Sequence, residues 1–137
     1  MRYILDTNIV SAVMKSDATV IARLRQQNRR DVLLAQPVVA EIEYGLARLT
    51  RSKRQRLLQE RFEVIRGTFE RVDWTDAVSA AFGEIKAVLE RKGRPIEDFD
   101  AAIAAHALAN TATLVTGNTK HMAGVPNLAV EDWLAQP

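Results

Sequence analysis

Four side chains that carry oxygen ligands follow apolar segments of the sequence, and three of them are acidic. Asp6 comes directly after a short apolar run, Glu41 lies shortly after a second one, and Asp100 stands near the start of an alanine-rich segment. Asn118 closely follows a third apolar run. Short apolar runs are typical of buried strands, and ligands of parallel sheets bind beyond the carboxyl ends of the strands. We therefore expect these four side chains to converge on one site.

Carboxylates that converge in this way favour a bound cation. Like charges about 4 Å apart repel strongly unless one is protonated or a cation neutralises them. The chain has no cysteine, so oxygen or imidazole ligands must hold any metal. Mg²⁺, for which Mn²⁺ can substitute, prefers oxygen ligands and keeps several waters, one of which it can activate for attack. The pattern predicts phosphodiester hydrolysis without a serine, cysteine or histidine nucleophile.

Asp6 and Glu41 each have a simpler interpretation as well. Asp6 can cap a helix that begins near Asn8, and on its own it is explained equally well as a cap and as a ligand. Glu41 can be an ordinary surface residue, as we expect for Glu43. Gly45 nevertheless lies one turn beyond Glu41 on the same face, where its missing side chain leaves room for an ion or a nucleic-acid backbone. Both interpretations stay open for the two acids.

Spacing selects the third acid. Glu97, Asp98 and Asp100 could each favour the N-terminus of the following helix. Asp100 alone shares a helix face with Ile103 and two alanines, which ties it most closely to the packed side. Asn118 could instead serve a turn.

The histidines and the large aromatic residues are expected to be structural. We expect His106 to be a partly buried helix residue and His121 a loop residue, with metal binding the weaker alternative for both. Four aromatic residues are expected to pack in the protein rather than to stack on bases: Tyr3, Tyr44, Trp74 and Trp133.

Apolar runs alternate with segments of helical periodicity along the chain. Strands are expected at residues 3–5, 31–35, 69–72, 113–116 and 127–130. Helices are expected at 9–14, after Asp17, after Pro37, at 53–66, from Thr75 to Gly93 and at 99–110. Their inward residues include Val39, Ile42, Leu46 and Leu49 in the third helix and Leu57, Leu58, Phe62 and Ile65 in the fourth. Parallel strands need helical crossovers, so we predict a three-layer α/β/α sandwich with a short central parallel sheet.

Composition and length fit one globular domain over residues 1–137. The chain is 47% hydrophobic and 26% charged, which excludes a disordered or disulfide-scaffold protein. No signal peptide or membrane span is evident, so we expect a cytoplasmic protein. The net charge of +2 says little about partners, but basic residues are clustered. Any one cluster can be a solvated helix face. Beside an acidic site, the clusters together indicate a partner with a nucleic-acid backbone. The basic residues that we expect to bind RNA are Arg48, Arg51, Lys53, Arg54 and Arg94.

Taken together, four segments of the sequence resemble the successive motifs of VapC-type PIN-domain toxins. They are residues 5–8 (Leu-Asp-Thr-Asn), 40–45 (Ala-Glu-Ile-Glu-Tyr-Gly), 100–107 (Asp-Ala-Ala-Ile-Ala-Ala-His-Ala) and 115–118 (Val-Thr-Gly-Asn). Each motif is weak by itself, whereas their order, spacing and the total length agree over essentially the whole chain. The resemblance implies an Mg²⁺-dependent endoribonuclease that cleaves structured RNA such as transfer or ribosomal RNA.

The resemblance also implies roles for individual residues. Asp6, Glu41 and Asp100 match the acidic triad, with Asp6 and Asp100 as metal ligands and Glu41 as a ligand or, through a water, a general base. The residues that organise these acids by hydrogen bonds are then Thr7, Asn8, Thr116 and Asn118. Asn118 departs from the pattern, since many PIN domains have an acid near that position. A neutral amide is a poorer ligand, which favours one metal ion over two.

The implied partners are an RNA substrate and an antitoxin protein that occupies the acidic groove. The protein would then bind promoter DNA only through the antitoxin. The chain is also expected to form a homodimer. Two alternatives remain: a catalytically silent PIN-fold module that binds nucleic acid or a partner, and an aspartate-based phosphoryl-transfer enzyme. A phosphatase of the haloacid-dehalogenase kind would have a second aspartate two residues after Asp6, where this chain has Asn8.

Overall fold

A five-stranded parallel sheet forms the centre of the molecule. The computed structural model describes residues 1–135. The strands are β1 (Tyr3–Leu5), β2 (Val32–Ala35), β3 (Glu70–Val72), β4 (Thr113–Val115) and β5 (Val130–Glu131). They lie in the order β3-β2-β1-β4-β5, and every neighbouring pair is parallel. The first strand is therefore central, and its carboxyl end lies between those of β2 and β4.

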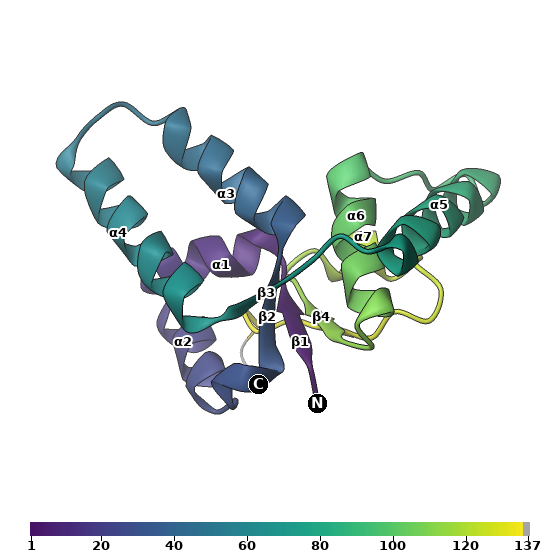
Figure 1. Cartoon of the computed structure of the whole chain (residues 1–137), viewed down its shortest axis with the longest axis horizontal. Helices are drawn as coiled ribbons and strands as arrows, with labels where there is room; N and C mark the ends of the chain where they lie inside the picture. The colour runs from purple at the N-terminus through teal and green to yellow at the C-terminus, as the bar shows by residue number, and fades with distance from the viewer. Residues whose placement is uncertain (136–137) are drawn as a thin grey trace.

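Helices cover both sides of this sheet, as the sequence predicts for an α/β sandwich. They are α1 (Thr7–Met14), α2 (Ala18–Arg25), α3 (Gln36–Ala47), α4 (Lys53–Thr68), α5 (Asp76–Arg91), α6 (Asp98–Ala109) and α7 (Thr119–Met122), with a 3₁₀ turn at Arg29–Asp31. Figure 1 shows α1 to α4 on one side of the strands and α5 and α6 on the other. The helices α3 and α4 form a hairpin whose turn extends away from the sheet. None of the helices described is long and apolar enough to cross a membrane.

The three inner strands are buried, as strands covered on both faces must be. Every residue of β1, β2 and the last two of β4 is buried. Trp133 is fully buried beside Tyr3, with ring centroids 5.2 Å apart, which confirms the predicted packing role of these two residues. Burial of this kind is the main favourable term in folding.

Local signals set the helix ends where the sequence predicts them. The side chains of Asp17, Ser52 and Thr75 each accept a hydrogen bond from a backbone amide in the first turn of α2, α4 and α5. Pro37 lies in the first turn of α3, where its missing N–H is harmless. Gly93 follows α5 with φ of 69°, a conformation that glycine adopts without strain.

Three expectations about packing were wrong. Leu49 lies beyond the end of α3 and is exposed, and Leu57 is exposed on α4 because its neighbour Leu58 takes the inward position. Tyr44 is 67% exposed. Trp74 is 46% exposed but packs against Phe82 and His106, as expected. The last strand is also later than predicted, at Val130–Glu131 rather than 127–130, because Asn127 adopts a positive φ of 65° that belongs to a turn.

Candidate active site

Asp6 lies at the carboxyl end of the central strand and is almost completely buried, with 3% of its surface exposed. Its Oδ1 accepts a hydrogen bond from the Thr7 amide at 2.8 Å, and its Oδ2 accepts one from the Thr116 hydroxyl at 2.7 Å. Burial raises the pKa of the Asp6 carboxyl, and the two hydrogen bonds oppose that rise. Asp6 is thus the N-cap of α1 and a fixed acid at the same time.

A network of hydrogen bonds joins the ends of β1 and β4 around Asp6. The Asn8 side chain accepts from the Gly117 amide at 3.0 Å and donates to the Thr116 hydroxyl oxygen at 3.4 Å. The backbone amide of Asn118 donates to the same hydroxyl oxygen at 3.0 Å. Asn118 therefore takes part in this network through its backbone amide. The Thr116 hydroxyl donates the hydrogen bond that Asp6 accepts.

Glu41 reaches the same end of the sheet from α3. The Thr7 hydroxyl donates to Glu41 Oε1 at 2.5 Å, which links the first turn of α1 to α3 across 34 residues of sequence. Gly45 has open space where a side chain would be, as its spacing from Glu41 predicts. Glu43 points elsewhere and lies 3.8 Å from Arg66 on α4. Glu41 and its neighbour Glu43 therefore have different surroundings.

Asp100 is the acid of α6 that faces this site. Its Oδ2 lies 3.8 Å from His121 Nε2, whereas Asp98 pairs with Lys86 of α5. Burial is the main reason why the pKa of Asp100 is raised; the charges of Asp6, Glu41 and Glu97 raise it further, while His121 lowers it. Because Asp6 and Glu41 act on Asp100, the three acids share one electrostatic environment.

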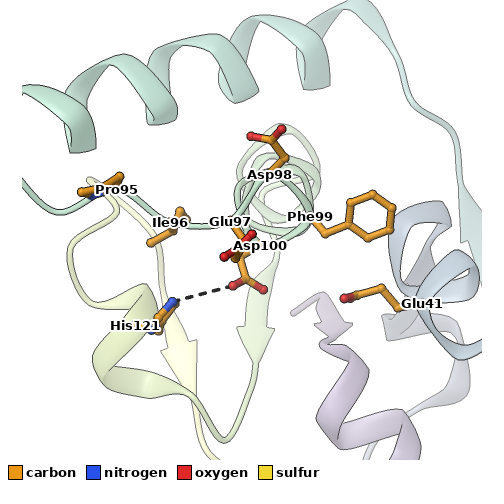
Figure 2. Close-up of a pocket in the computed structure, with 8 residues that line it drawn as sticks. All are labelled: Glu41, Pro95, Ile96, Glu97, Asp98, Phe99, Asp100 and His121. Carbon is orange, nitrogen blue, oxygen red and sulfur yellow. Dashed lines mark ion pairs between the residues drawn. The ribbon is translucent and has the colours of Figure 1, made fainter. Parts of the chain in front are cut away.

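An open cleft of about 810 Å³ lies over these acids. Figure 2 shows the carboxyl groups of Glu41 and Asp100 approaching the cleft from opposite sides, with His121 beside Asp100. Asp6 is buried and is not part of the cleft wall. The residues that line it are Glu41, Pro95, Ile96, Glu97, Asp98, Phe99, Asp100 and His121.

The donor set suits a hard divalent cation. Within residues 1–135, no group of three or more histidine, cysteine, aspartate or glutamate side chains is placed so that it could hold a metal ion by itself. Mg²⁺ does not require such a group, since it is held through one or two carboxylates and keeps several waters. Asp6 and Asp100, whose pKa values are both raised, are carboxylates that a cation would stabilise in their ionised form.

The basic residues assigned to RNA fall into two groups. Arg48 and Arg54 line a hollow of about 290 Å³ that shares Glu41 with the cleft. Arg94 lines a smaller hollow of about 160 Å³ that shares His121 with the cleft. Arg51 and Lys53 lie at the turn between α3 and α4 and line neither hollow.

The sequence analysis placed His121 in a loop, whereas it belongs to the short helix α7 and lines the cleft. It did not single out Phe99, an exposed aromatic residue next to Asp100 in the chain that also lines the cleft. His106, in contrast, is fully buried rather than partly buried. Its Nδ1 lies 2.7 Å from the Ala102 carbonyl oxygen, and burial lowers its pKa.

Comparison with known proteins agrees with this arrangement. Residues 3–126 match the model of the PIN domain, and the chain belongs to that family. Ribonuclease VapC2 of Rickettsia felis is 34% identical over 135 residues, covering 97% of this chain and 98% of the relative. The tRNA(fMet)-specific endonuclease VapC of Shigella flexneri is 30% identical over 136 residues, covering 97% and 98%. Within the PIN family, the chain is of the VapC type.

Solved structures show the same fold. The crystal structure of VapBC2 from Rickettsia felis, bound to a DNA fragment from their promoter, contains a chain with a TM-score of 0.87 and 32% identity, covering 97% of this chain and 99% of that one. A chain of FitAcB from Neisseria gonorrhoeae has a TM-score of 0.82 and 28% identity, covering 98% and 99%. The predicted α/β sandwich with a parallel sheet is confirmed.

Proposed function

We propose that this protein is the toxin of a toxin–antitoxin pair and acts as a metal-dependent endoribonuclease on structured RNA, such as transfer or ribosomal RNA. The observation that carries the proposal is that Glu41 and Asp100 line one open cleft and that the charge of the buried Asp6 acts on Asp100. Relatives of nearly the same length are named as ribonucleases, and one of them as specific for a transfer RNA.

In this mechanism, Asp6 and Asp100 would hold Mg²⁺ or Mn²⁺, and Glu41 would either join them or orient the attacking water as a base. When bound, the ion would make water more acidic and stabilise negative charge on the phosphate. The protein keeps its acids in place: the Thr116 hydroxyl holds Asp6, and the Thr7 hydroxyl holds Glu41. Hydrogen bonds of this kind orient metal-binding carboxylates and sustain activity. Asn118 is neutral, which favours a single ion.

The partners follow from the same relatives. VapBC2 from Rickettsia felis was solved bound to a DNA fragment from their promoter, and FitAB was solved bound to an IR36 DNA fragment. We propose that this chain likewise binds an antitoxin across its acidic groove, meets promoter DNA only through that antitoxin, and forms a homodimer in the cytoplasm. The antitoxin and RNA would then compete for one cleft, and an arginine of the antitoxin is the group that would pair best with its carboxylates.

The test is cleavage of total cellular RNA by the purified, antitoxin-free protein in Mg²⁺, in Mn²⁺ and in chelator, together with the variants Asp6→Asn and Asp100→Asn. Discrete fragments that disappear in chelator and in both variants are expected. Cleavage that survives both substitutions would contradict the assigned site. Absence of cleavage under every condition would instead favour the silent binding module, for which the neutral Asn118 is the supporting observation.

A further inference from the structure

Phe99 is an aromatic side chain placed among the acids of the cleft. It is 46% exposed, although it is the immediate chain neighbour of Asp100. Figure 2 shows its ring extending from the start of α6 toward the side of the cleft where Glu41 lies. Single exposed apolar residues are common on protein surfaces. This one differs because carboxylates flank it inside a cleft.

The cleft therefore has two kinds of wall. Pro95, Ile96 and Phe99 contribute apolar surface, while Glu41 and Asp100 contribute charged oxygens. A site for a purely ionic ligand needs no apolar wall. A nucleotide has both characters, because its phosphate is charged and its base is a flat, largely apolar ring. The volume of about 810 Å³ lies within the range of ligand sites, roughly 300–1,000 Å³.

We propose that Phe99 stacks on the base next to the phosphate that is cleaved. This inference rests on the proposed ribonuclease function and assigns the residue that holds this base. Phe99 and Asp100 line the same cleft, so a nucleotide whose phosphate lies at Asp100 can place its base against Phe99. In a duplex both faces of each base are already stacked, whereas loops and single strands leave a face free for an aromatic side chain.

The surroundings of the cleft suit an extended strand. On the Glu41 side, Arg48 and Arg54 line the adjoining hollow; on the His121 side, Arg94 and Lys120 line the other. Phosphates before and after the cleaved one would thus meet basic side chains, which attract the backbone without reading sequence. Stacking at Phe99 is then the contact that requires one base to be unpaired.

Binding of a fluorescent single-stranded ten-nucleotide RNA tests the inference without relying on catalysis. Affinity is measured by anisotropy in Ca²⁺, with the RNA checked for integrity, for the full chain and for Phe99→Ala, Phe99→Leu and Phe99→Tyr. Val64→Ala, which removes another exposed apolar side chain from α4, is the matched control. Loss of stacking is expected to weaken binding by roughly 5- to 150-fold in Phe99→Ala. Phe99→Tyr should bind like the unchanged protein, and Phe99→Leu should resemble Phe99→Ala.

A series of RNAs that each lack one base locates the stacked nucleotide. If Phe99 stacks on a base, one abasic position weakens binding to the unchanged protein and has no further effect in Phe99→Ala, the signature of a direct coupling. Full affinity of Phe99→Ala or Phe99→Leu, or equal binding of the same sequence as a duplex, would overturn the inference.

Cleavage of total cellular RNA in Mg²⁺ separates this inference from the proposed function. Normal cleavage by Phe99→Ala would overturn stacking and leave the ribonuclease intact. Absence of cleavage by the unchanged protein, with binding of the ten-nucleotide RNA that still depends on Phe99, would overturn the ribonuclease and support stacking. If the unchanged protein does not bind the ten-nucleotide RNA, stacking is overturned, and the cleavage of total RNA decides the ribonuclease by itself.

Discussion

The helix α6 and the hairpin of α3 and α4 place their functional residues in opposite ways. In α6, all residues from Ala101 to Ala107 are buried, and this helix packs between α5 and the sheet. In α4, only Leu58, Phe62 and Ile65 are buried along sixteen residues. Asp100 stands on the buried helix, whereas Arg48 and Arg54 stand near the exposed turn of the hairpin. Groups that must hold an ion in fixed geometry are on the rigid element, and groups that attract a phosphate backbone are on the solvated one.

Glu41 is the exception, because it is an acid on the exposed hairpin. If the cleft is catalytic, Glu41→Gln should lower kcat for RNA cleavage by about 10³-fold, the effect of several kcal/mol of transition-state stabilisation. Glu43→Gln is the matched control, because Glu43 is two residues away and faces Arg66 instead. It should change kcat by less than about twofold. If Glu41→Gln and Glu43→Gln changed kcat equally, Glu41 would not belong to the catalytic site.

The Thr7 hydroxyl is what ties Glu41 to the rigid part of the molecule. Thr7→Val should therefore lower activity by roughly 10- to 100-fold, as is typical for groups that orient metal-binding residues. Thr7→Ser keeps the hydroxyl and should retain most of the activity. Thermal unfolding of both variants shows whether the fold persists. A Thr7→Ser variant as inactive as Thr7→Val, at unchanged stability, would speak against the hydrogen bond as the cause.

The arginines of the hairpin should act through charge alone. The double variant Arg48→Ala, Arg54→Ala is expected to lower kcat/KM about tenfold at low salt. It should also reduce the slope of log kcat/KM against log salt by about 1.4, from two lost contacts to a single strand. Arg29 and Arg30 precede β2, at the other end of the strands. Their double alanine variant should leave the slope unchanged, and an equal loss there would mean that RNA binding is not confined to the surroundings of the cleft.

The smallest predicted effect is the change in thermal stability caused by replacing Asp100. The raised pKa of Asp100 means that the folded protein holds this proton more tightly than the unfolded chain. Protonated Asp100 therefore stabilises the folded state at pH values below the ordinary carboxyl pKa. This contribution is lost as the pH rises through the raised pKa. Asp100→Asn should raise Tm at pH 7 by roughly 2–8 °C, the shift that about 1 kcal/mol produces, and the gain should vanish near pH 3.5.

The matched control for this prediction is Asp98→Asn. Asp98 also lines the cleft, but it pairs with Lys86 and is not among the charges that raise the pKa of Asp100, so its removal should not stabilise the protein. A gain in Tm that is the same for both variants, or that persists at pH 3.5, would show that repulsion among the acids of the cleft is not its source.

Local patterns were sufficient to predict most of the fold. Asp17 and Thr75 cap the first turns of α2 and α5, and Gly93 follows the end of α5. Each affects only residues close to it in the sequence, so these helix ends can be predicted. The apolar runs of β1 and β2 predict buried strands because burial on both faces leaves no polar alternation. The turn at Asn127 was not predicted, since its positive φ depends on how the chain approaches the sheet.

The site could be predicted in part, for a related reason. Each acid was found from its place after a strand or at a helix start, but the link from Thr7 to Glu41 joins residues 34 apart, which no local pattern reveals. His121 was set aside as a loop residue because its neighbour Asp100 is distant in sequence. Phe99 carried a usable signal, since it is an aromatic residue directly before a predicted site acid.

Direct measurement of Mn²⁺ binding tests the central claim most closely. Free Mn²⁺ is followed by electron paramagnetic resonance as the antitoxin-free protein is added, and the same titration is made with Asp6→Asn, Asp100→Asn and the surface control Asp98→Asn. The account predicts one bound ion per chain, lost in Asp6→Asn and Asp100→Asn and kept in Asp98→Asn. Binding that is unchanged in both Asp6→Asn and Asp100→Asn would contradict it.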